Sequence, residues 1–256
     1  MIALVTGASS GIGRDMARAL AHSGYDLIIT ARNKEKMQDL KEELEKKVNI
    51  NVDIMPRDLS KVEECESLYN EVKSKYETID ILINNAGFGL CGEFTETDLD
   101  IELSMIDTNI KAMHILTKLF LKDMVEKDSG KILNVASIAG FMPGPLMATY
   151  YASKSYVVRL TQSIQEELRR KKSKVRISLL CPGPVNTNFN NVANVRFAMN
   201  GFSSQYIANY TIKKLNQNKL ILVPGFKIKM ARFFSKIFPD KIAAKFCYNV
   251  QEKKIK

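Results

Sequence analysis

The sequence predicts an α/β fold, a doubly wound sheet of seven parallel strands with helices on both faces and a C-terminal helical extension. Three observations support this prediction. Short apolar runs rich in β-branched residues alternate with segments whose apolar residues recur every three or four positions. A glycine-rich turn directly follows the first apolar run. No stretch rich in Pro, Gly or Ser interrupts the alternation, so a single domain is the economical interpretation.

The strands are predicted from seven apolar runs, at residues 2–6, 26–30, 50–55, 79–83, 131–135, 175–181 and 219–223. Helices are predicted between them, at residues 12–23, 34–47, 60–76, 98–126, 150–170 and 203–217. Ser60 with Glu63, and Thr97 with Asp100, have the spacing of capping boxes at two helix starts. Strands that alternate with helices pair in parallel, because right-handed crossovers return the chain to the sheet in the same direction. The predicted domain covers residues 1–226, including a substrate loop at about 188–218, and the extension at 227–256 is expected to pack on it.

The composition is that of an ordinary globular protein. The chain has 256 residues, 45% of them apolar and 26% charged, which excludes a disordered or fibrous protein. The first residues lack the basic segment of a signal peptide, and no apolar run reaches the roughly 18 residues of a spanning helix. Neither a disulfide scaffold nor a zinc site is indicated, because four cysteines lie far apart, at Cys65, Cys91, Cys181 and Cys247. A cytoplasmic protein is therefore predicted.

The positive charge is concentrated at the C-terminal end. Net charge is +10, and residues 227–256 contribute +7 of it, from nine Lys or Arg against Asp240 and Glu252. Apolar residues in the same segment have helical spacing. Three interpretations compete: helices packed over the substrate mouth, which we favour, peripheral contact with an anionic membrane, or a landing site for an acidic carrier or CoA. No nucleic-acid partner is predicted, because a broad basic face with aromatic elements is missing from the pattern.

The glycine-rich turn has the spacing of a phosphate-binding loop. It follows a predicted strand, precedes a predicted helix and reads Gly-x-x-x-Gly-x-Gly from Gly7 to Gly13. Glycines let the backbone approach a pyrophosphate, and the free N–H groups of the helix start stabilise the anion. The predicted cofactor-binding residues here are Gly7, Ser9, Ser10, Gly11, Ile12 and Gly13.

With four further motifs in order, residues 1–190 resemble the short-chain dehydrogenase/reductase family. The motifs are Thr6–Gly13, the segment Asn84-Asn85-Ala86-Gly87, Asn109, Ser137 with the Tyr150 and Lys154 pair, and the Pro-Gly segment 182–187. The resemblance implies a Rossmann fold, a nicotinamide cofactor, and a homodimer or homotetramer built through the helices at 98–126 and 150–170. It also implies cofactor contacts at Asn85, Ala86, Gly87, Tyr150, Lys154, Pro182, Gly183, Val185 and Thr187.

Tyr150 and Lys154 form the predicted catalytic pair. They are four residues apart in a predicted helix and so share one face. A phenol with a pKa near 10 is a weak acid at neutral pH, and a neighbouring ammonium is expected to lower that pKa and make Tyr150 a general acid/base. Tyr151 is the rival phenol, but its partner at the same spacing is Ser155, which carries no charge.

Two further residues complete the predicted catalytic set. Ser137, at the end of the fifth strand, can donate a hydrogen bond to a carbonyl oxygen that gains negative charge. The resemblance implies that Asn109 holds a water that links Lys154 to solvent. His22 and His114 lack nearby ligand partners in the sequence and are interpreted as structural, so no metal is predicted. Cys181 is interpreted as a small buried residue.

The end of the second strand predicts a preference for NADP, with NAD less favoured. An acidic residue there would hold the ribose 2′-OH of NAD, but this chain has Ala31 and Arg32. A guanidinium pairs well with a 2′-phosphate, so Arg32, helped by Arg14, is predicted to contact it. Asp58 is similar to the family's adenine contact and is equally compatible with a helix-entry turn.

The predicted function is NADP(H)-dependent reduction of a carbonyl. The loops expected near Ser137 and Tyr150 are mostly apolar, which favours a ketone, aldehyde or oxoacyl group on an apolar body. Two alternatives remain open, a 3-oxoacyl-carrier or CoA reductase and a nicotinamide-sensing protein without catalysis. The intact set of Asn109, Ser137, Tyr150 and Lys154 weighs against the second.

Overall fold

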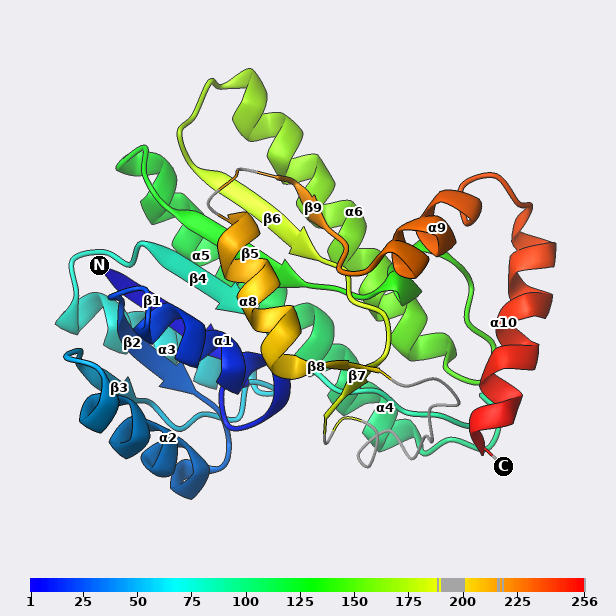
Figure 1. Ribbon diagram of the computed structural model, residues 1–256, viewed down its shortest axis with the longest axis horizontal. Helices are drawn as coiled ribbons and strands as arrows, with labels where there is room; N and C mark the ends of the chain where they lie inside the picture. The colour runs from blue at the N-terminus through cyan, green and yellow to red at the C-terminus, as the bar shows by residue number, and fades with distance from the viewer. Residues whose placement is uncertain (188, 190–200, 216, 218, 256) are drawn as a thin grey trace.

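The computed structural model describes residues 1–187, 189, 201–215, 217 and 219–255 and contains the predicted sheet (Figure 1). Seven parallel strands are ordered β3-β2-β1-β4-β5-β6-β9. Their bounds are β1 Ile2–Thr6, β2 Asp26–Thr30, β3 Val52–Ile54, β4 Ile81–Asn84, β5 Lys131–Val135, β6 Arg176–Leu180 and β9 Ile221–Leu222. The order reverses between β1 and β4, where the two halves of a doubly wound sheet meet.

Helices cover both faces of the sheet, as predicted. One face packs against α1 (Gly11–Ala21), α2 (Lys34–Lys47) and α8 (Ser204–Leu215). The opposite face packs against α3 (Val62–Lys75), α5 (Met113–Glu126) and α6 (Ala148–Arg170). The strands are buried on both sides, which explains why their sequences are continuous apolar runs rather than alternating ones.

The segment predicted as one helix at 98–126 has a π-helical turn in its middle. It contains α4 (Leu99–Ile106), the π-helix η1 (Asp107–Ala112) and α5. A π-helical turn inserts one extra residue into the helical repeat and turns the following side chains to a new direction. This turn carries Asn109.

Both predicted capping boxes are wrong. Helix α3 begins after Lys61, which makes no side-chain cap, while the Ser60 hydroxyl donates to Asp58. The cap of α4 is Asp98, whose carboxylate accepts the backbone N–H of Ile101 at 3.0 Å. The Thr97 hydroxyl instead donates to Glu102, because that buried carboxylate needs hydrogen-bond donors.

After β6 the chain forms a small second sheet and then a helix that packs on the main sheet. Strand β7 (Val185–Asn186) pairs with β8 (Phe202–Ser203) in a small second sheet. Helix α8 packs against α1 in the main core, so this part of the predicted substrate loop is a structural layer. The remainder of that loop, residues 188, 190–200, 216 and 218, lies outside the described residues.

Two C-terminal helices, α9 (Phe226–Phe234) and α10 (Asp240–Ile255), follow β9 at one side of the molecule (Figure 1). Ile228 of α9 is buried against the core that α6 and β6 form. Arg232 lies 5.0 Å from the centre of the Phe141 ring. Among the residues that the structure describes, no helix is both long enough and apolar enough to cross a membrane.

Helices α1, α2 and α8 are joined by a buried carboxylate. Asp15 is 6% exposed and accepts hydrogen bonds from Arg18 at 2.8 Å and from the Ser204 hydroxyl. Arg18 continues to Glu43 of α2. A buried charge is stable only when it is paired and hydrogen-bonded, as this one is.

We expect Asp15→Ala to destabilise the fold by about 1–3 kcal/mol, because Arg18 and Ser204 lose their shared partner. Urea unfolding would measure this change. Asp39→Ala, at an exposed position of α2, is the matched control, with an expected change within about 0.5 kcal/mol. Equal effects of the two substitutions would contradict a role for Asp15 in joining the helices.

Candidate active site

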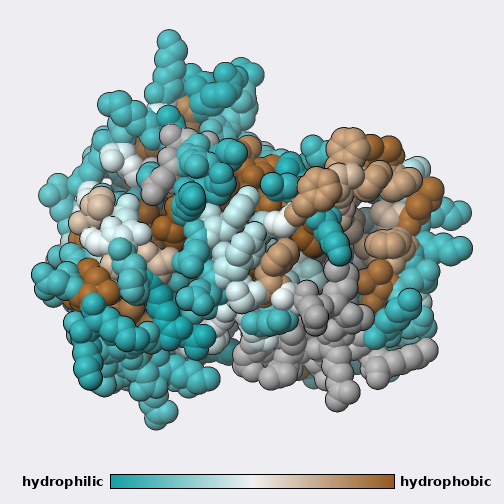
Figure 2. All heavy atoms as spheres, in the orientation of Figure 1, coloured by the Kyte–Doolittle hydropathy of each residue, from teal (hydrophilic) through white to brown (hydrophobic). Residues whose placement is uncertain are grey.

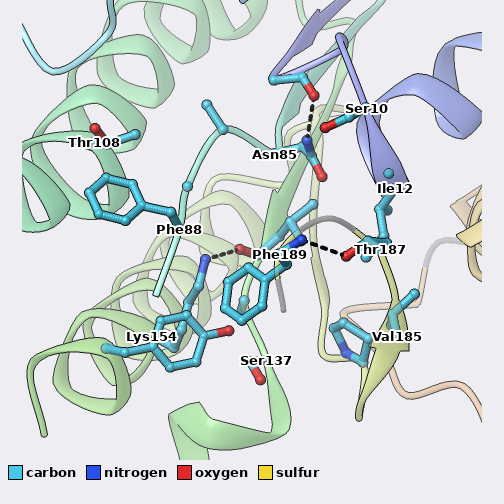
Figure 3. A pocket seen from close by; sticks show the side chains of 18 of the residues that line it. Ser10, Ile12, Asn85, Phe88, Thr108, Ser137, Lys154, Val185, Thr187 and Phe189 are labelled. Carbon is cyan, nitrogen blue, oxygen red and sulfur yellow. Dashed lines mark hydrogen bonds between the residues drawn. The ribbon is translucent and has the colours of Figure 1, made fainter. Parts of the chain in front are cut away.

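A cavity of about 430 Å³ opens at the carboxyl ends of the central strands (Figure 3). Most of the predicted site residues line it: Gly7, Ser9, Ser10, Gly11, Ile12, Arg32, Asp58, Asn85, Ala86, Gly87, Ser137, Tyr150, Lys154, Pro182, Gly183, Val185 and Thr187. Two predicted residues, Gly13 and Asn109, are outside the lining. The parallel strands place these side chains together because their carboxyl ends share one edge of the sheet.

The glycine turn requires glycine for two different reasons. Gly7 and Gly11 have φ values of +65° and +54°, which side chains disfavour. Gly13 has ordinary backbone, but a Cβ there would lie 2.4 Å from both the Gly7 carbonyl oxygen and the Asn85 amide nitrogen. Gly13 is therefore a packing position between helix and strand rather than a lining residue.

Four hydrogen bonds hold the loop after β4 against the end of β1. The Thr6 hydroxyl oxygen accepts the backbone N–H groups of Asn85 and Ala86, both at 2.9 Å. The Asn85 side-chain amide donates to the carbonyl oxygens of Thr6 at 3.0 Å and Gly7 at 3.3 Å. This exchange fixes the glycine turn and the 85–87 loop against each other, and both segments line the pocket.

Ser137, Tyr150 and Lys154 meet at the far end of the pocket. Ser137 follows β5 and forms a side-chain hydrogen bond with Tyr150 of α6. The Lys154 ammonium is one turn further along α6, where it donates to the Val135 carbonyl at 3.0 Å and lies 5.8 Å from the centre of the Tyr150 ring. Figure 3 shows Ser137 and Lys154 in the same cavity as Thr187.

Burial decides the protonation states of this pair. Burial raises the pKa of Tyr150 to about 12, and the hydrogen bond with Ser137 opposes the rise. Burial also lowers the pKa of Lys154 to about 8. Lys154 was expected to lower the pKa of Tyr150, but the net shift of that pKa is upward, because burial outweighs opposing effects and the ammonium is directed at the Val135 carbonyl. At neutral pH Tyr150 holds a proton that it can donate, although a pKa this far above neutral makes it a weak acid.

Asn109 clamps the loop after β4 from behind. Its side chain accepts the Phe88 N–H at 3.0 Å and donates to the Phe88 carbonyl at 2.9 Å and to the Ser153 hydroxyl at 3.1 Å. A Cβ on Gly87 would lie 2.6 Å from the Asn109 oxygen and 3.5 Å from the Lys154 nitrogen. Asn109 and Lys154 therefore both pack against Gly87, and the water relay between them stays a prediction.

Three basic residues surround the outer end of the pocket. Arg32, Lys36 and Arg57 line it together with Asp58. The pKa of Asp58 is lower than its usual value. Burial acts to raise this pKa, but hydrogen bonds from Ser60 and the positive charge of Arg32 together lower it by more. Arg57 is already ion-paired with Glu71. Arg14, expected to help Arg32, is outside the lining and lies beside Asp15.

Comparison with known proteins agrees with this geometry. The family model described as "short chain dehydrogenase" matches residues 1–196. The chain belongs to the short-chain dehydrogenase family. An uncharacterized oxidoreductase of Staphylococcus saprophyticus is 36% identical over 73% of this chain and 79% of its own.

Two solved structures have similar folds. A short-chain dehydrogenase from Sphingobium yanoikuyae in complex with NADPH has a TM-score of 0.84 and 25% identity, with 92% of each chain covered. A short-chain dehydrogenase/reductase from Burkholderia phymatum in complex with NAD has a TM-score of 0.82 and 23% identity, with 90% of this chain and 91% of that one covered. The second, at this identity, supports the fold alone.

The structure of this short-chain dehydrogenase adds lining residues that the sequence analysis missed. Lys36 lines the pocket but lies in a segment with many lysines, so its charge alone does not distinguish it. Its position four residues after Arg32 does indicate that it lies near the same end of the pocket. Gln251 lines the pocket from α10, about 100 residues after Tyr151, to which its amide donates at 2.5 Å. No local pattern indicates that contact. Phe189 also lines the pocket and packs against Tyr150 with ring centres 5.5 Å apart.

Other predictions for single residues are consistent with the structure. Cys181 is fully buried, and burial raises the pKa of its thiol to about 12, so it packs as a small apolar residue. His22 contacts the Arg18 carbonyl, and His114 contacts the Tyr156 hydroxyl at 2.8 Å. Both histidines therefore have structural partners.

We expect Lys154→Met to change how stability depends on pH. Between the folded pKa near 8 and the free value of 10.5, the unfolded lysine holds a proton that the folded protein has released, so wild-type stability rises with pH over this window. The variant lacks this rise. Relative to the variant, the wild type should gain about 3 kcal/mol from neutral pH to the top of the window.

Urea unfolding of both proteins across that window would measure the difference. Titration of Tyr150 is common to both proteins and cancels in the comparison. A difference in stability that stays constant with pH would mean that Lys154 is not buried as a costly cation.

Proposed function

We propose that this short-chain dehydrogenase is an NADP(H)-dependent reductase of carbonyl groups on apolar substrates, with Tyr150 as the general acid. One observation carries the proposal. Ser137, Tyr150 and Lys154 converge at one end of a pocket whose middle is the glycine turn and whose outer end is basic. This arrangement provides a proton donor, a hydrogen-bond donor and a place for a dinucleotide within one cavity.

The residues present fit a dinucleotide. Gly7 and Gly11 leave the turn without side chains where a pyrophosphate would approach the start of α1, and the free N–H groups there would hold it. Asn85 and Gly87 would contact the ribose, with Val185 and Thr187 near the nicotinamide. The bound nicotinamide would supply the hydride. A preference for NADP rests on Arg32 and Lys36 at the outer end and on Ala31 where NAD enzymes carry an acid.

Residues of the protein would then orient the substrate carbonyl oxygen and protonate it. The Ser137 hydroxyl would donate a hydrogen bond to the carbonyl oxygen and orient it. The Tyr150 hydroxyl, protonated at neutral pH, would transfer its proton to that oxygen as negative charge develops there. Lys154, still largely charged at pH 7 with a pKa near 8, would stabilise the phenolate that remains. The product is an alcohol.

An apolar substrate is favoured by the wall around these groups. Phe88, Met147 and Phe189 line the cavity near Tyr150, and Asp58 at the opposite end is the single carboxylate among the described lining residues. A pocket of this kind binds an apolar body by burial and uses its few polar groups to fix orientation. A 3-oxoacyl thioester is the second candidate, because the basic helices α9 and α10 lie beside the pocket where an acidic carrier or CoA would dock.

We expect Tyr150→Phe to lower kcat by about 10²–10⁴-fold, because the variant has no proton to donate. NADPH affinity should stay within about twofold, since the ring remains in place. NADPH oxidation with ring ketones, long-chain aldehydes, diketones and acetoacetyl-CoA would measure turnover, and protein fluorescence would measure binding.

Tyr151→Phe is the matched control for this variant. Its hydroxyl contacts Gln251 and it should keep turnover within about tenfold. Full activity of Tyr150→Phe would refute the assignment. Tight NADPH binding with no turnover of any substrate by the wild type would favour a nicotinamide-sensing protein.

We expect Arg32→Gln to weaken NADPH binding by about 10–100-fold and to leave NADH binding unchanged, because it removes one charge-assisted contact to the 2′-phosphate. Arg14→Gln is the control, since Arg14 is outside the lining and should change neither affinity. Isothermal titration with both cofactors would decide. An equal loss for NADH and NADPH would contradict recognition of the 2′-phosphate by Arg32.

A further inference from the structure

The two C-terminal helices expose an unusual amount of apolar surface. Nine of the eighteen large apolar side chains that are exposed among the described residues lie between positions 226 and 250. They are Phe226, Phe233, Phe234, Ile237, Phe238, Ile242, Phe246, Tyr248 and Val250, which we call the C-terminal apolar face. Figure 2 shows apolar groups gathered over α9 and α10. Single exposed apolar residues are normal on a protein surface, but a contiguous group of this kind marks an interaction site.

This exposure is not a failure of the helices to pack. Each helix has a second face that is buried in the protein. Ile228 is 8% exposed, Cys247 is 4% exposed and Gln251 is 2% exposed. In α10 the buried residues Cys247 and Gln251 directly follow the exposed residues Phe246 and Val250. Successive residues of an α-helix are rotated by about 100°, so the buried face and the exposed apolar face point in different directions. The helices thus have an inner face that holds them and an outer face that is apolar.

Positive charges are interleaved with the apolar face. Exposed lysines lie among its members, at Lys227, Lys229, Lys236, Lys241 and Lys245, and Asp240 is the single acidic residue from 226 to 250. Aromatic and aliphatic side chains mixed with lysines on one side of a helix are typical of segments that lie in the interface of an anionic membrane. The apolar groups enter the acyl boundary while the lysines contact the lipid phosphates.

We propose that α9 and α10 dock the protein on an anionic lipid surface through the C-terminal apolar face. A second copy of the chain is a poorer occupant, because a symmetric contact would place these lysines against each other. An acidic protein would satisfy the charges, but protein interfaces are depleted of lysine, and here lysines lie among five exposed phenylalanines, at Phe226, Phe233, Phe234, Phe238 and Phe246.

The docking helix also forms a wall of the active-site pocket. Gln251, on the inner face of α10, lines the cavity and donates to the Tyr151 hydroxyl, next to Tyr150. Docking would therefore bring the pocket within one helix diameter of the lipid, from which an apolar substrate could enter. This last step rests on the proposed function. Docking itself does not.

Co-sedimentation of the full chain with vesicles tests the proposal. We expect binding to vesicles of phosphatidylcholine with phosphatidylserine, weak binding to phosphatidylcholine alone, and a loss of binding at high salt. The measurement needs neither cofactor nor turnover, so an inactive protein that binds would refute the proposed function and leave docking supported.

Charge and apolar variants separate the two contributions. Lys241→Gln with Lys245→Gln should weaken binding to anionic vesicles by about 30-fold. Lys46→Gln with Lys47→Gln, at the exposed end of α2 on the other side of the molecule, removes the same charge and should have less than twofold effect. Phe246→Ser with Val250→Ser should weaken binding by about tenfold or more. Val125→Ser is the control, since Val125 is 37% exposed and Val250 is 38% exposed.

Thermal unfolding would show that each variant is folded. Failure of the wild type to bind anionic vesicles would overturn the proposal, as would equal losses in the test and control variants. Binding to an acyl-carrier protein without vesicle binding would assign the face to a protein partner instead. Dissociation of a dimer by the Phe246 variant, again without vesicle binding, would assign it to a second copy.

Discussion

The proposed active site depends on how closely the carboxyl ends of β1 and β4 are held together. Thr6 accepts two backbone N–H groups from the loop after β4, and Asn85 returns two hydrogen bonds to the end of β1. These strands are the neighbours at which the sheet order reverses. The loop lies so close to the glycine turn that no Cβ fits at Gly7 or Gly13. A side chain there would push the 85–87 loop away from the glycine turn, and Gly87 of that loop is the residue packed next to Lys154.

The far end of the pocket combines two ionisable groups whose charged forms burial disfavours. Burial raises the pKa of Tyr150 and lowers that of Lys154, so at neutral pH the phenol is neutral and the ammonium is still mostly charged. The phenol thus has a proton to give, but its raised pKa makes it a weaker acid than free tyrosine, so the proposed donation depends on Lys154 stabilising the phenolate as it forms. Holding an ammonium there costs stability, which the Val135 carbonyl offsets only in part. The buried strands on either side supply the stability that the site itself does not.

The sequence predicts the strands and the glycine turn well because their physical causes are local. Buried parallel strands need continuous apolar runs, and a turn with positive φ needs glycine at Gly7 and Gly11. The caps, the π-helical turn at Asn109 and the pocket contact of Gln251 were missed. Each depends on a partner set by tertiary structure: Thr97 turns to the buried Glu102, and Gln251 meets Tyr151 from about 100 residues away. The pKa of Tyr150 was misjudged for the same reason, because spacing indicates a neighbouring charge but not the depth of burial.

The C-terminal helices illustrate a limit of periodicity as a guide to packing. Apolar residues at helical spacing in 227–256 predicted helices packed on the domain, and the inner contacts of Ile228, Cys247 and Gln251 agree with that expectation. Yet apolar residues lie on more than one side of each helix, and one face of contact cannot bury them all. The part left exposed is also the part interleaved with lysines. Because the inner and outer faces belong to the same short helix, whatever covers Phe246 and Val250 also constrains Gln251, and through Tyr151 the wall beside Tyr150.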